Sequence, residues 1–398
     1  MSIALAQRLA NVTGSATMKV AAEADRLKRA GIQIVDFGAG EPDFPTPSHV
    51  KDAAKAAIDA NFSRYTNSMG IPEFREAVCA QYKRDWGIDF TPAEVLITNG
   101  GKQALFNTAL ALFNPGDEVI THAPYWPTIP EQVKLVGAVP VIVQTSSTDG
   151  FRVAPESIIA AITPKTKAII LNSPGNPTGA LIDESAVAAI AEEAARRDIW
   201  VVVDLCYEQL IYEPVPHNLP KTLFDRHRAK TVLCGSASKS YAMTGWRCGW
   251  TVAPKELTSV FNIIQGQTTS NITSITQKAA LAAISGSQDA VTVMLDEYRQ
   301  RRDNIHAWLT AHPGIQCVKP KGAFYLFPNI GALLAPGTTS TDFAQALLEK
   351  EHVVVTPGEA FDAPGYLRIS YATSMEQLRE GATRILRFAE SLQHAAAR

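Results

Sequence analysis

One lysine, Lys239, stands among small and hydroxyl-bearing residues just after residues 231–234, an apolar run that is typical of a buried strand. Ligands of open α/β sheets bind just beyond the strand ends, and a lysine held there can lose its proton and attack a carbonyl carbon. Ser236, Ser238 and Arg247 suit a phosphate, because hydroxyls and a guanidinium can share its oxygens. This combination indicates pyridoxal phosphate (PLP) held by Lys239 as a Schiff base, although a surface lysine in a serine-rich loop would be an alternative.

Polar residues also follow two other predicted strands. Asn172 comes after the apolar run 168–171, and Asp204 comes after the run 200–203. Continuous β-branched runs indicate strands that are buried on both faces, and a helical stretch lies between these two. This βαβ order predicts a largely parallel sheet covered by helices. We therefore expect Asn172, Asp204 and Ser236 to line one edge of the sheet and to form a single site.

The overall composition excludes several classes of protein. The 398 residues are 46% hydrophobic and 19% charged, which predicts a globular chain of two domains with a large core. A net charge of −2 argues against a nucleic-acid or polybasic membrane surface, and no apolar run reaches the ~20 residues of a membrane span. The five cysteines are dispersed and no secretion signal is recognisable, so we expect a reduced, cytoplasmic protein. The histidines are scattered, and no metal site is expected.

Two segments rich in glycine or proline are expected to bring backbone close to a ligand. Residues 38–47 are interrupted too often for regular structure, and Gly40 within this predicted loop is a candidate for substrate contact. The loop also fits a crossover between domains. Gly101 and Lys102 lie where the predicted strand 95–98 turns into a helix, and N–H groups at a helix N-terminus form an anion site. For two glycines alone, a plain strand-to-helix connection would be the preferred interpretation.

The Ser-x-Ser-Lys that ends at Lys239, followed by Gly-x-Arg-x-Gly around Arg247, resembles the cofactor-lysine signature of class I aminotransferases. The Gly-Glu-Pro-Asp-Phe at residues 40–44 and the Asn-Ser-Pro-Gly-Asn-Pro-Thr-Gly at residues 172–179 are similar to two further motifs of that family. These motifs follow the family order over nearly the whole chain.

The resemblance implies an α/β protein with the PLP-dependent transferase fold type I. A large domain with a mostly parallel seven-stranded sheet would span residues 46–295. A small α+β domain would combine residues 1–45 and 296–398. The family also implies a homodimer whose active sites are shared between the subunits.

The resemblance further implies a role for each residue around the cofactor. Lys239 would hold PLP and move a proton at the substrate Cα, and Asp204 would keep the ring nitrogen protonated. Tyr207 would bond the phenolic oxygen, and Trp126 would pack on the ring beside the substrate. Leu205 departs from the pattern, which has an acid at this position. The phosphate would be bound by Gly101, Lys102, Ser236, Ser238 and Arg247, and by Tyr65 of the neighbouring subunit.

The substrate would be held at both of its ends. Asn176 would contact the ring oxygen and the substrate carboxylate, and Arg368 would grip the α-carboxylate with its planar guanidinium. Thr17 and Lys102 are candidates for a distal carboxylate, because the segments around them resemble bacterial aspartate aminotransferases. The predicted reaction is amino transfer between aspartate and a 2-oxo acid such as 2-oxoglutarate. The alternatives are an aromatic, prephenate or broad-range aminotransferase, a PLP-dependent C–S lyase, and a PLP-binding regulator, which would carry a DNA-binding extension.

Overall fold

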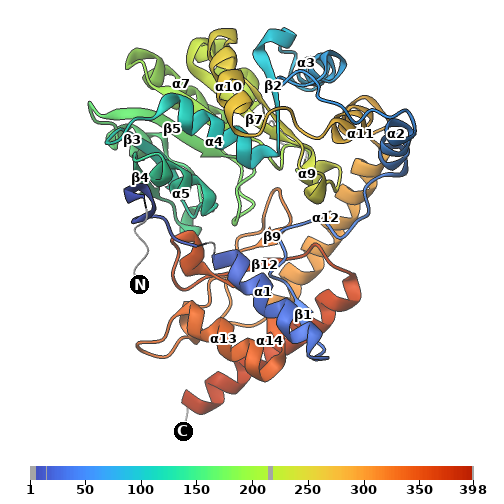
Figure 1. The fold of residues 1–398 in the computed structure, drawn as a ribbon. Helices are drawn as coiled ribbons and strands as arrows, with labels where there is room; N and C mark the ends of the chain where they lie inside the picture. The colour runs from blue at the N-terminus through green and yellow to red at the C-terminus, as the bar shows by residue number, and fades with distance from the viewer. Residues whose placement is uncertain (1–5, 15, 214–217, 397–398) are drawn as a thin grey trace.

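The structure, a computed structural model, describes residues 6–14, 16–213 and 218–396. Two lobes are visible in Figure 1. The upper part, here called the sheet lobe, contains the seven-stranded sheet and its covering helices. The lower part, here called the small lobe, contains short-stranded sheets and the C-terminal helices. The long helix α12 (Asp289–Thr310) runs from one lobe into the other.

The sheet lobe is built on strands in the order β2-β8-β7-β6-β5-β3-β4. Neighbouring strands are parallel except at β8, which runs antiparallel to both β2 and β7. The predicted α/β class with a mostly parallel seven-stranded sheet is therefore confirmed. The strands are β2 (Val95–Thr98), β3 (Glu118–Ala123), β4 (Val139–Gln144), β5 (Thr166–Asn172), β6 (Trp200–Asp204), β7 (Thr231–Ser236) and β8 (Gly249–Val252).

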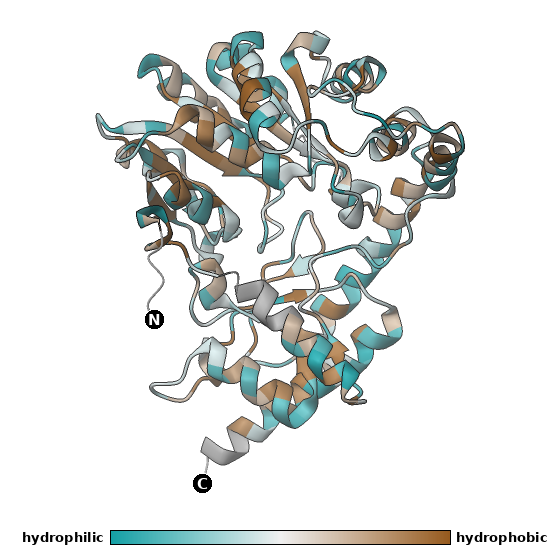
Figure 2. Cartoon of the chain, viewed as in Figure 1, coloured by the Kyte–Doolittle hydropathy of each residue, from teal (hydrophilic) through white to brown (hydrophobic). Residues whose placement is uncertain are grey.

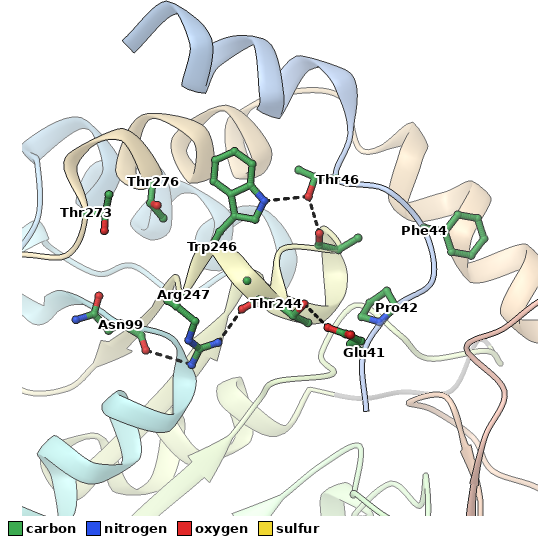
Figure 3. A pocket seen from close by; sticks show the side chains of 12 residues that line it. Glu41, Pro42, Phe44, Thr46, Asn99, Thr244, Trp246, Arg247, Thr273 and Thr276 are labelled. Carbon is green, nitrogen blue, oxygen red and sulfur yellow. Dashed lines mark hydrogen bonds between the residues drawn. The ribbon is translucent and has the colours of Figure 1, made fainter. Parts of the chain in front are cut away.

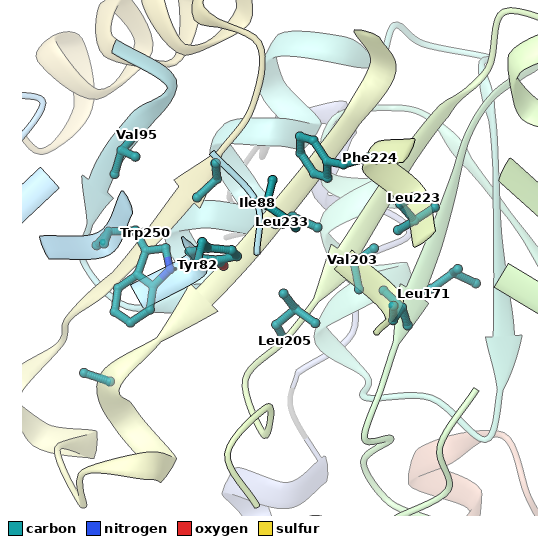
Figure 4. Close-up of a cluster of buried hydrophobic side chains, with 14 of the residues drawn as sticks. Tyr82, Ile88, Val95, Leu171, Val203, Leu205, Leu223, Phe224, Leu233 and Trp250 are labelled. Carbon is teal, nitrogen blue, oxygen red and sulfur yellow. Dashed lines mark hydrogen bonds between the residues drawn. The ribbon is translucent and has the colours of Figure 1, made fainter. Parts of the chain in front are cut away.

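Helices cover both faces of this sheet, as continuous apolar strands require. Alternate residues of a strand point to opposite faces, so Val201 and Val203 join one buried cluster while Val202 joins another. The first cluster includes Trp250, which packs against Tyr82 of α3 (Figure 4). Figure 2 shows the same arrangement as strongly hydrophobic strands beneath helices with hydrophilic outer faces.

The helices of the sheet lobe divide between the two clusters. One cluster takes side chains from α2, α3, α7, α8 and α11, and the other from α4, α5 and α10. The bounds of these helices are α2 (Ser48–Asp59), α3 (Pro72–Trp86), α4 (Gly101–Leu112), α5 (Thr128–Leu135), α6 (Pro155–Ala160), α7 (Glu184–Arg196), α8 (Leu219–His227), α9 (Ala237–Ser240), α10 (Lys255–Thr268) and α11 (Ser274–Ser285).

The small lobe joins a segment near the start of the chain to its C-terminal part. Strand β1 pairs in parallel with β10, and β12 lies between β11 and β9 in an antiparallel sheet. Apolar residues recur at helical spacing near the C-terminus, which predicts an amphipathic helix, and Leu378, Ile385 and Ala389 form the buried stripe of α14 (Met375–Ala396). The elements are α1 (Ala16–Arg29), β1 (Val35–Asp36), β9 (Tyr325–Leu326), α13 (Ser340–Glu351), β10 (Val353–Val354), β11 (Thr356–Pro357), β12 (Leu367–Ser370) and α14 (Met375–Ala396).

The sequence predicts short strands at residues 32–37 and 322–327, and both are shorter still in the structure. Each contributes two residues to its ladder. Pro72 and Gly87 are typical of a helix start and a helix end, and α3 spans Pro72–Trp86 with Gly87 at φ 67° closing it. Within the described ranges, no helix combines the length and the apolar character that a membrane crossing would require.

Candidate active site

Lys239 lies in a cavity of about 550 Å³ that is lined by residues of both lobes. Strand β7 ends at Ser236, whose Oγ accepts a hydrogen bond from the Ser238 N–H at 3.1 Å and so starts α9. From this short helix, the Nζ of Lys239 donates to the carbonyl oxygen of Gly40 at 2.5 Å. Burial lowers the pKa of Lys239; Cys206 and Glu41 oppose the shift, and the charges of Arg368 and Arg247 add to it. The lowered pKa increases the proportion of the neutral, nucleophilic amine.

The ends of three neighbouring strands bring Asn172, Asp204 and Ser236 to the cavity wall. Asp204 Oδ1 accepts a hydrogen bond from the Cys206 N–H at 3.0 Å. Burial raises the pKa of Asp204 to about 6, although this hydrogen bond and the charge of Lys239 oppose the shift. A cationic ligand group beside Asp204 would keep its carboxylate ionised. This wall can therefore hold a protonated ring nitrogen.

Asn176 is fixed through the loop that follows β5. Its N–H donates to Asn172 Oδ1 at 2.9 Å, and Asn172 Nδ2 in turn donates to the Asp204 carbonyl oxygen at 3.2 Å. The loop is closed by a further hydrogen bond from Gly179 N–H to the Gly175 carbonyl oxygen at 2.8 Å. These hydrogen bonds fix the backbone of Asn176 relative to the strand ends, and Asn176 lines the cavity.

Arg368 reaches the cavity from β12 and is only 3% exposed. Its Nη1 donates to Asn176 Oδ1 at 3.3 Å, and its Nη2 donates to the carbonyl oxygen of Gly38 at 2.9 Å. Its Nε is buried and has no hydrogen-bond partner in the described part of the chain. The guanidinium therefore retains donor capacity for a planar anion such as a carboxylate.

The N-terminus of α4 and Arg247 both line the cavity. A side chain at Gly100, whose φ is +82°, would place its Cβ 2.5 Å from Arg247 Nη2, so the close approach requires glycine. Figure 3 shows the guanidinium bonded to the carbonyl oxygens of Thr244 and Asn99, at 2.9 and 3.4 Å. Helix N–H groups, an arginine and two serine hydroxyls together suit a phosphate.

Five cations line the cavity. Lys28 is paired with Asp36 at 2.8 Å, and the other four are Lys102, Lys239, Arg247 and Arg368. Across the described ranges, none of the four forms a salt bridge. Lys102 Nζ lies 5.0 Å above the ring of Trp126, and burial together with the charge of Arg247 lowers the pKa of Lys102. The carboxylates of Asp25, Asp36, Glu41 and Asp204 line the same cavity. A bound anion beside the four cations would relieve the repulsion among them.

Comparisons with known proteins agree on one family. The family described as aminotransferase class I and II matches residues 32–385. The aspartate aminotransferase of Geobacillus stearothermophilus is 43% identical over 389 residues, covering 97% of this chain and 99% of the relative. The aspartate/prephenate aminotransferase of Cereibacter sphaeroides is 43% identical over 396 residues, covering 98% and 99%. The solved Thermus thermophilus aspartate aminotransferase with maleate has a TM-score of 0.92 and 40% identity, covering 97% of this chain and 100% of that one.

The chain belongs to the aminotransferase class I and II family. It is thus an enzyme, a transaminase, with the fold-type I architecture that its sequence predicts. Membership of this family implies PLP as the cofactor.

The cavity of this aminotransferase brings together most of the residues that the sequence singled out. Tyr65 is absent from its wall and is 91% exposed on the surface, so its assignment to a neighbouring subunit stays a prediction. The side chain of Thr17 lies outside the described part of the structure, as does Ser15. The predicted residues that do line the cavity are Gly40, Gly101, Lys102, Trp126, Asn176, Asp204, Tyr207, Ser236, Ser238, Lys239, Arg247 and Arg368.

Leu205 occupies the position where the family pattern has an acid. In this aminotransferase Leu205 is fully buried in the hydrophobic cluster behind the strand ends (Figure 4). It does not contribute to the cavity wall, whereas Asp204, Cys206 and Tyr207 do. The departure therefore changes the packing behind the site and leaves the cavity-facing groups in place.

Several residues that line or support the site were not identified from the sequence, Tyr325 and His122 among them. Tyr325 of β9 lines the cavity, and its hydroxyl lies 2.8 Å from that of Tyr207. His122 of β3 lies behind the wall, where its Nε2 accepts a hydrogen bond from the Asn172 N–H at 3.4 Å. Burial lowers the pKa of His122 to about 4, which keeps the imidazole neutral and able to accept. Alternation along β9 could have indicated that one face of the strand points into the cavity, but it does not show which face does so.

Proposed function

We propose that this aminotransferase moves the amino group of L-aspartate to a 2-oxo acid such as 2-oxoglutarate, with PLP as its cofactor. The observation that carries the proposal is the buried amine of Lys239 between Asp204 on one wall and Arg368 on the other. Lys239 can hold the cofactor, Asp204 can hold the proton on its ring nitrogen, and Arg368 can hold a substrate carboxylate.

The residues present fit PLP. Lys239 would hold it covalently, Asp204 would face its ring nitrogen, and Tyr207 would donate to its phenolic oxygen. Trp126 would pack on the ring. When bound, PLP withdraws electrons from the substrate Cα and so makes the Cα proton acidic. The phosphate would lie on the N–H groups of Gly101 and Lys102, on the hydroxyls of Ser236 and Ser238, and on Arg247.

Lys239 is also the candidate for proton transfer. Burial lowers the pKa of its amine, so the amine can accept the proton from the substrate Cα and later return one as ammonium. Burial likewise raises the pKa of Tyr207 well above its usual value, which keeps its hydroxyl protonated and able to donate. Asp204 stays ionised beside a protonated ring nitrogen and thereby holds that proton in place.

The substrate would be held by Arg368 and Asn176 at its α-carboxylate, beside Gly40. Lys102, with Thr17, would hold a second carboxylate. Two comparisons support aspartate: the Geobacillus stearothermophilus relative is named aspartate aminotransferase, and the Thermus thermophilus structure contains maleate, a dicarboxylate. The Cereibacter sphaeroides relative is named aspartate/prephenate aminotransferase, so prephenate is the second candidate substrate.

A homodimer with shared active sites is part of the proposal. Tyr65 is exposed in the single chain, and so are the apolar side chains of Ile58 and Ile263. An open hollow of about 670 Å³ lies beside Arg247, and its wall includes Asn99 (Figure 3). A second subunit would cover these side chains and bring its Tyr65 to the phosphate.

The domain division and the location also belong to the proposal. We assign residues 46–295 to the large domain and residues 1–45 and 296–398 to the small one. Most buried side chains of the small lobe form a cluster of their own, which also takes in Tyr207, Leu210, Tyr212 and Met294. All five cysteines are free, which supports a reducing compartment such as the cytoplasm.

A single assay tests the proposed reaction. The enzyme is mixed with PLP, aspartate and 2-oxoglutarate, and the products are separated. We expect oxaloacetate and glutamate in equal amounts. Release of ammonia with no glutamate would instead indicate a lyase. Parallel reactions with phenylalanine and with glutamate plus prephenate measure the alternatives. If kcat/KM for phenylalanine or for prephenate exceeds the value for aspartate, the assignment of aspartate is contradicted.

A further inference from the structure

Tyr325 lies at the junction of the two lobes. It is 1% exposed and belongs to β9, where it pairs with Ser370 beside Arg368 on β12. Its hydroxyl lies 2.8 Å from the Tyr207 hydroxyl, which belongs to the sheet lobe. Its ring lies beneath the guanidinium of Arg368, with 4.5 Å between the guanidinium carbon and the ring centroid. One side chain therefore contacts both a predicted cofactor ligand and the predicted carboxylate ligand.

The two hydroxyls share one hydrogen bond, and its direction matters. Either oxygen can be the donor by geometry. Burial raises the pKa of both tyrosines, so each keeps its single proton. The other titratable and charged groups that face the pair are Cys206, Glu41 and Arg368. If Tyr207 is to donate its own proton to a ligand, Tyr325 must be the donor within the pair.

The ring of Tyr325 constrains Arg368 in a different way. The guanidinium lies between two aromatic rings, with Phe361 at 5.1 Å from its carbon and Tyr325 at 4.5 Å. Attraction between the cation and the ring faces favours this position. Among the residues that the structure describes, two acceptors bind its donors, namely Asn176 Oδ1 and the Gly38 carbonyl oxygen. The aromatic rings therefore contribute to holding the guanidinium plane against the cavity.

We propose that Tyr325 is a positioning residue that serves both ends of the site. Its hydroxyl directs the Tyr207 proton toward the phenolic oxygen of PLP, and its ring orients Arg368 for the substrate α-carboxylate. The inference rests on the proposed function, because it requires PLP beside Tyr207 and an amino acid on Arg368. The proposal predicts two effects that can be measured separately. Loss of the Tyr325 hydroxyl should affect the cofactor, and loss of the Tyr325 ring should affect substrate binding.

Two substitutions separate these effects, and a third is the matched control. Tyr325→Phe removes only the hydroxyl, and Tyr325→Leu removes the ring as well. Tyr371→Phe is the control, because Tyr371 also donates to a buried tyrosine hydroxyl, that of Tyr212 at 3.1 Å, but neither of these two lines the cavity. Each holoenzyme is titrated by visible absorbance, and KM and kcat are measured with aspartate and with phenylalanine.

We expect Tyr325→Phe to raise the apparent pKa of the visible transition of bound PLP by about half a unit or more, because Tyr207 then donates less strongly. Its KM values should stay within about twofold of the wild type. Tyr325→Leu should show the same spectral shift and should raise KM for both amino acids about tenfold, with a smaller change in kcat. In a Tyr207→Phe background, Tyr325→Phe should cause no further spectral shift.

The outcomes distinguish the inference from the function on which it rests. A wild-type holoenzyme without a pH-dependent visible band, or without transamination, would contradict the proposed function. A normal wild type whose Tyr325→Phe variant titrates like the Tyr371→Phe control would overturn the hydroxyl role while leaving the function intact. Unchanged KM values in a folded Tyr325→Leu variant would overturn the ring role. Thermal melting of each variant separates loss of folding from these effects.

Discussion

The two walls of the cavity are built in different ways. On the sheet-lobe wall, Asn172, Asp204 and Ser236 lie at the ends of adjacent strands whose register is fixed by ladders buried on both faces. On the small-lobe wall, Arg368 and Tyr325 lie on strands of only four and two residues. Arg368 is held by one side chain and one loop carbonyl oxygen, and both could be exchanged for a ligand.

This difference suggests that the sheet-lobe wall serves the cofactor chemistry and the small-lobe wall serves substrate recognition. Chemistry at the cofactor needs groups that are held in one place, and a central parallel sheet provides that rigidity. Recognition of several substrates needs contacts that can be exchanged, and short strands and loops provide them. Substitutions in the sheet-lobe wall should therefore lower turnover for every substrate. Substitutions among the substrate-binding residues should mainly change affinity and specificity.

The largest effect is expected at Lys239. Lys239→Ala removes both the amine that would hold PLP and the group that would move the Cα proton, so kcat should fall by at least ~10⁴-fold. The pH-dependent visible band should also disappear. Lys221→Ala is the control, since this lysine is exposed and, in the described part of the chain, forms its ion pair with Asp225. Measurable turnover at more than a thousandth of the wild-type rate would place the reactive amine elsewhere.

A smaller but still general loss is expected at Asp204. Asp204→Asn can accept a hydrogen bond but has no charge to hold the ring proton, so transamination of every amino acid should fall by ~10²–10³-fold. PLP should remain bound, as measured by absorbance after gel filtration. Near-normal activity in this variant would mean that another acid serves the ring nitrogen, and that the sheet-lobe wall is less specialised than we suggest.

The substrate contacts should separate affinity from specificity. Arg368→Ala should lower kcat/KM for aspartate and phenylalanine alike, by ~10²-fold, because both carry the α-carboxylate. Lys102→Ala should lower kcat/KM selectively for aspartate by about 30-fold, equivalent to ~2 kcal/mol for a charge-assisted hydrogen bond. Equal losses for both amino acids in the Lys102 variant would contradict the role in binding a second carboxylate, and the aromatic or broad-range alternative would be favoured.

The smallest effect on activity, but a clear effect on stability, is expected behind the sheet-lobe wall. Glu208 is buried; Gln81 Nε2 donates to its Oε1 at 3.1 Å, while its Oε2 has no partner in the described part of the chain. Burial and the charge of Asp85 raise the pKa of Glu208 to about 8. Between pH ~4.5 and ~8 the unfolded carboxyl releases its proton while the folded one keeps it. The free energy of unfolding should therefore fall as pH rises, by up to ~1.4 kcal/mol per unit.

Glu208→Gln cannot ionise and should lose this dependence. The variant should become more stable relative to the wild type as pH rises from 5 to 7.5, by ~2–3 kcal/mol, with nearly unchanged kcat. Melting temperatures of the two proteins at both pH values provide the measurement. A constant difference between them would show that Glu208 is ionised in the folded protein throughout this range.

The sheet-lobe wall could be predicted from the sequence because local signals determine it. Continuous β-branched runs indicated buried parallel strands, and the polar residue at each strand end then had to lie at one edge. Asn172 and Asp204 follow directly from that argument. Lys239 and the residues of the phosphate site follow from the turn after β7 and the glycines before α4. Their meeting in one cavity is what the structure adds.

The small-lobe wall could be predicted only in part. Arg368 was found through a motif, but Tyr325 was missed because alternation in a strand does not reveal which face is inward. The bond between Arg368 and the Gly38 carbonyl oxygen depends on the backbone path of a loop, which composition does not specify. The two-residue length of β9 depends on distant pairing partners. Tyr65 requires a second subunit, which no single-chain argument can place.

The most direct test of the account is to locate the bound cofactor chemically. The holoenzyme is reduced with borohydride, digested and analysed by mass spectrometry for a PLP-modified peptide, with a control in which excess aspartate is added before reduction. We predict one modified residue, Lys239, and a marked loss of labelling when aspartate is added first. Stoichiometric labelling of a different lysine in active enzyme would contradict the central claim that Lys239 holds the cofactor.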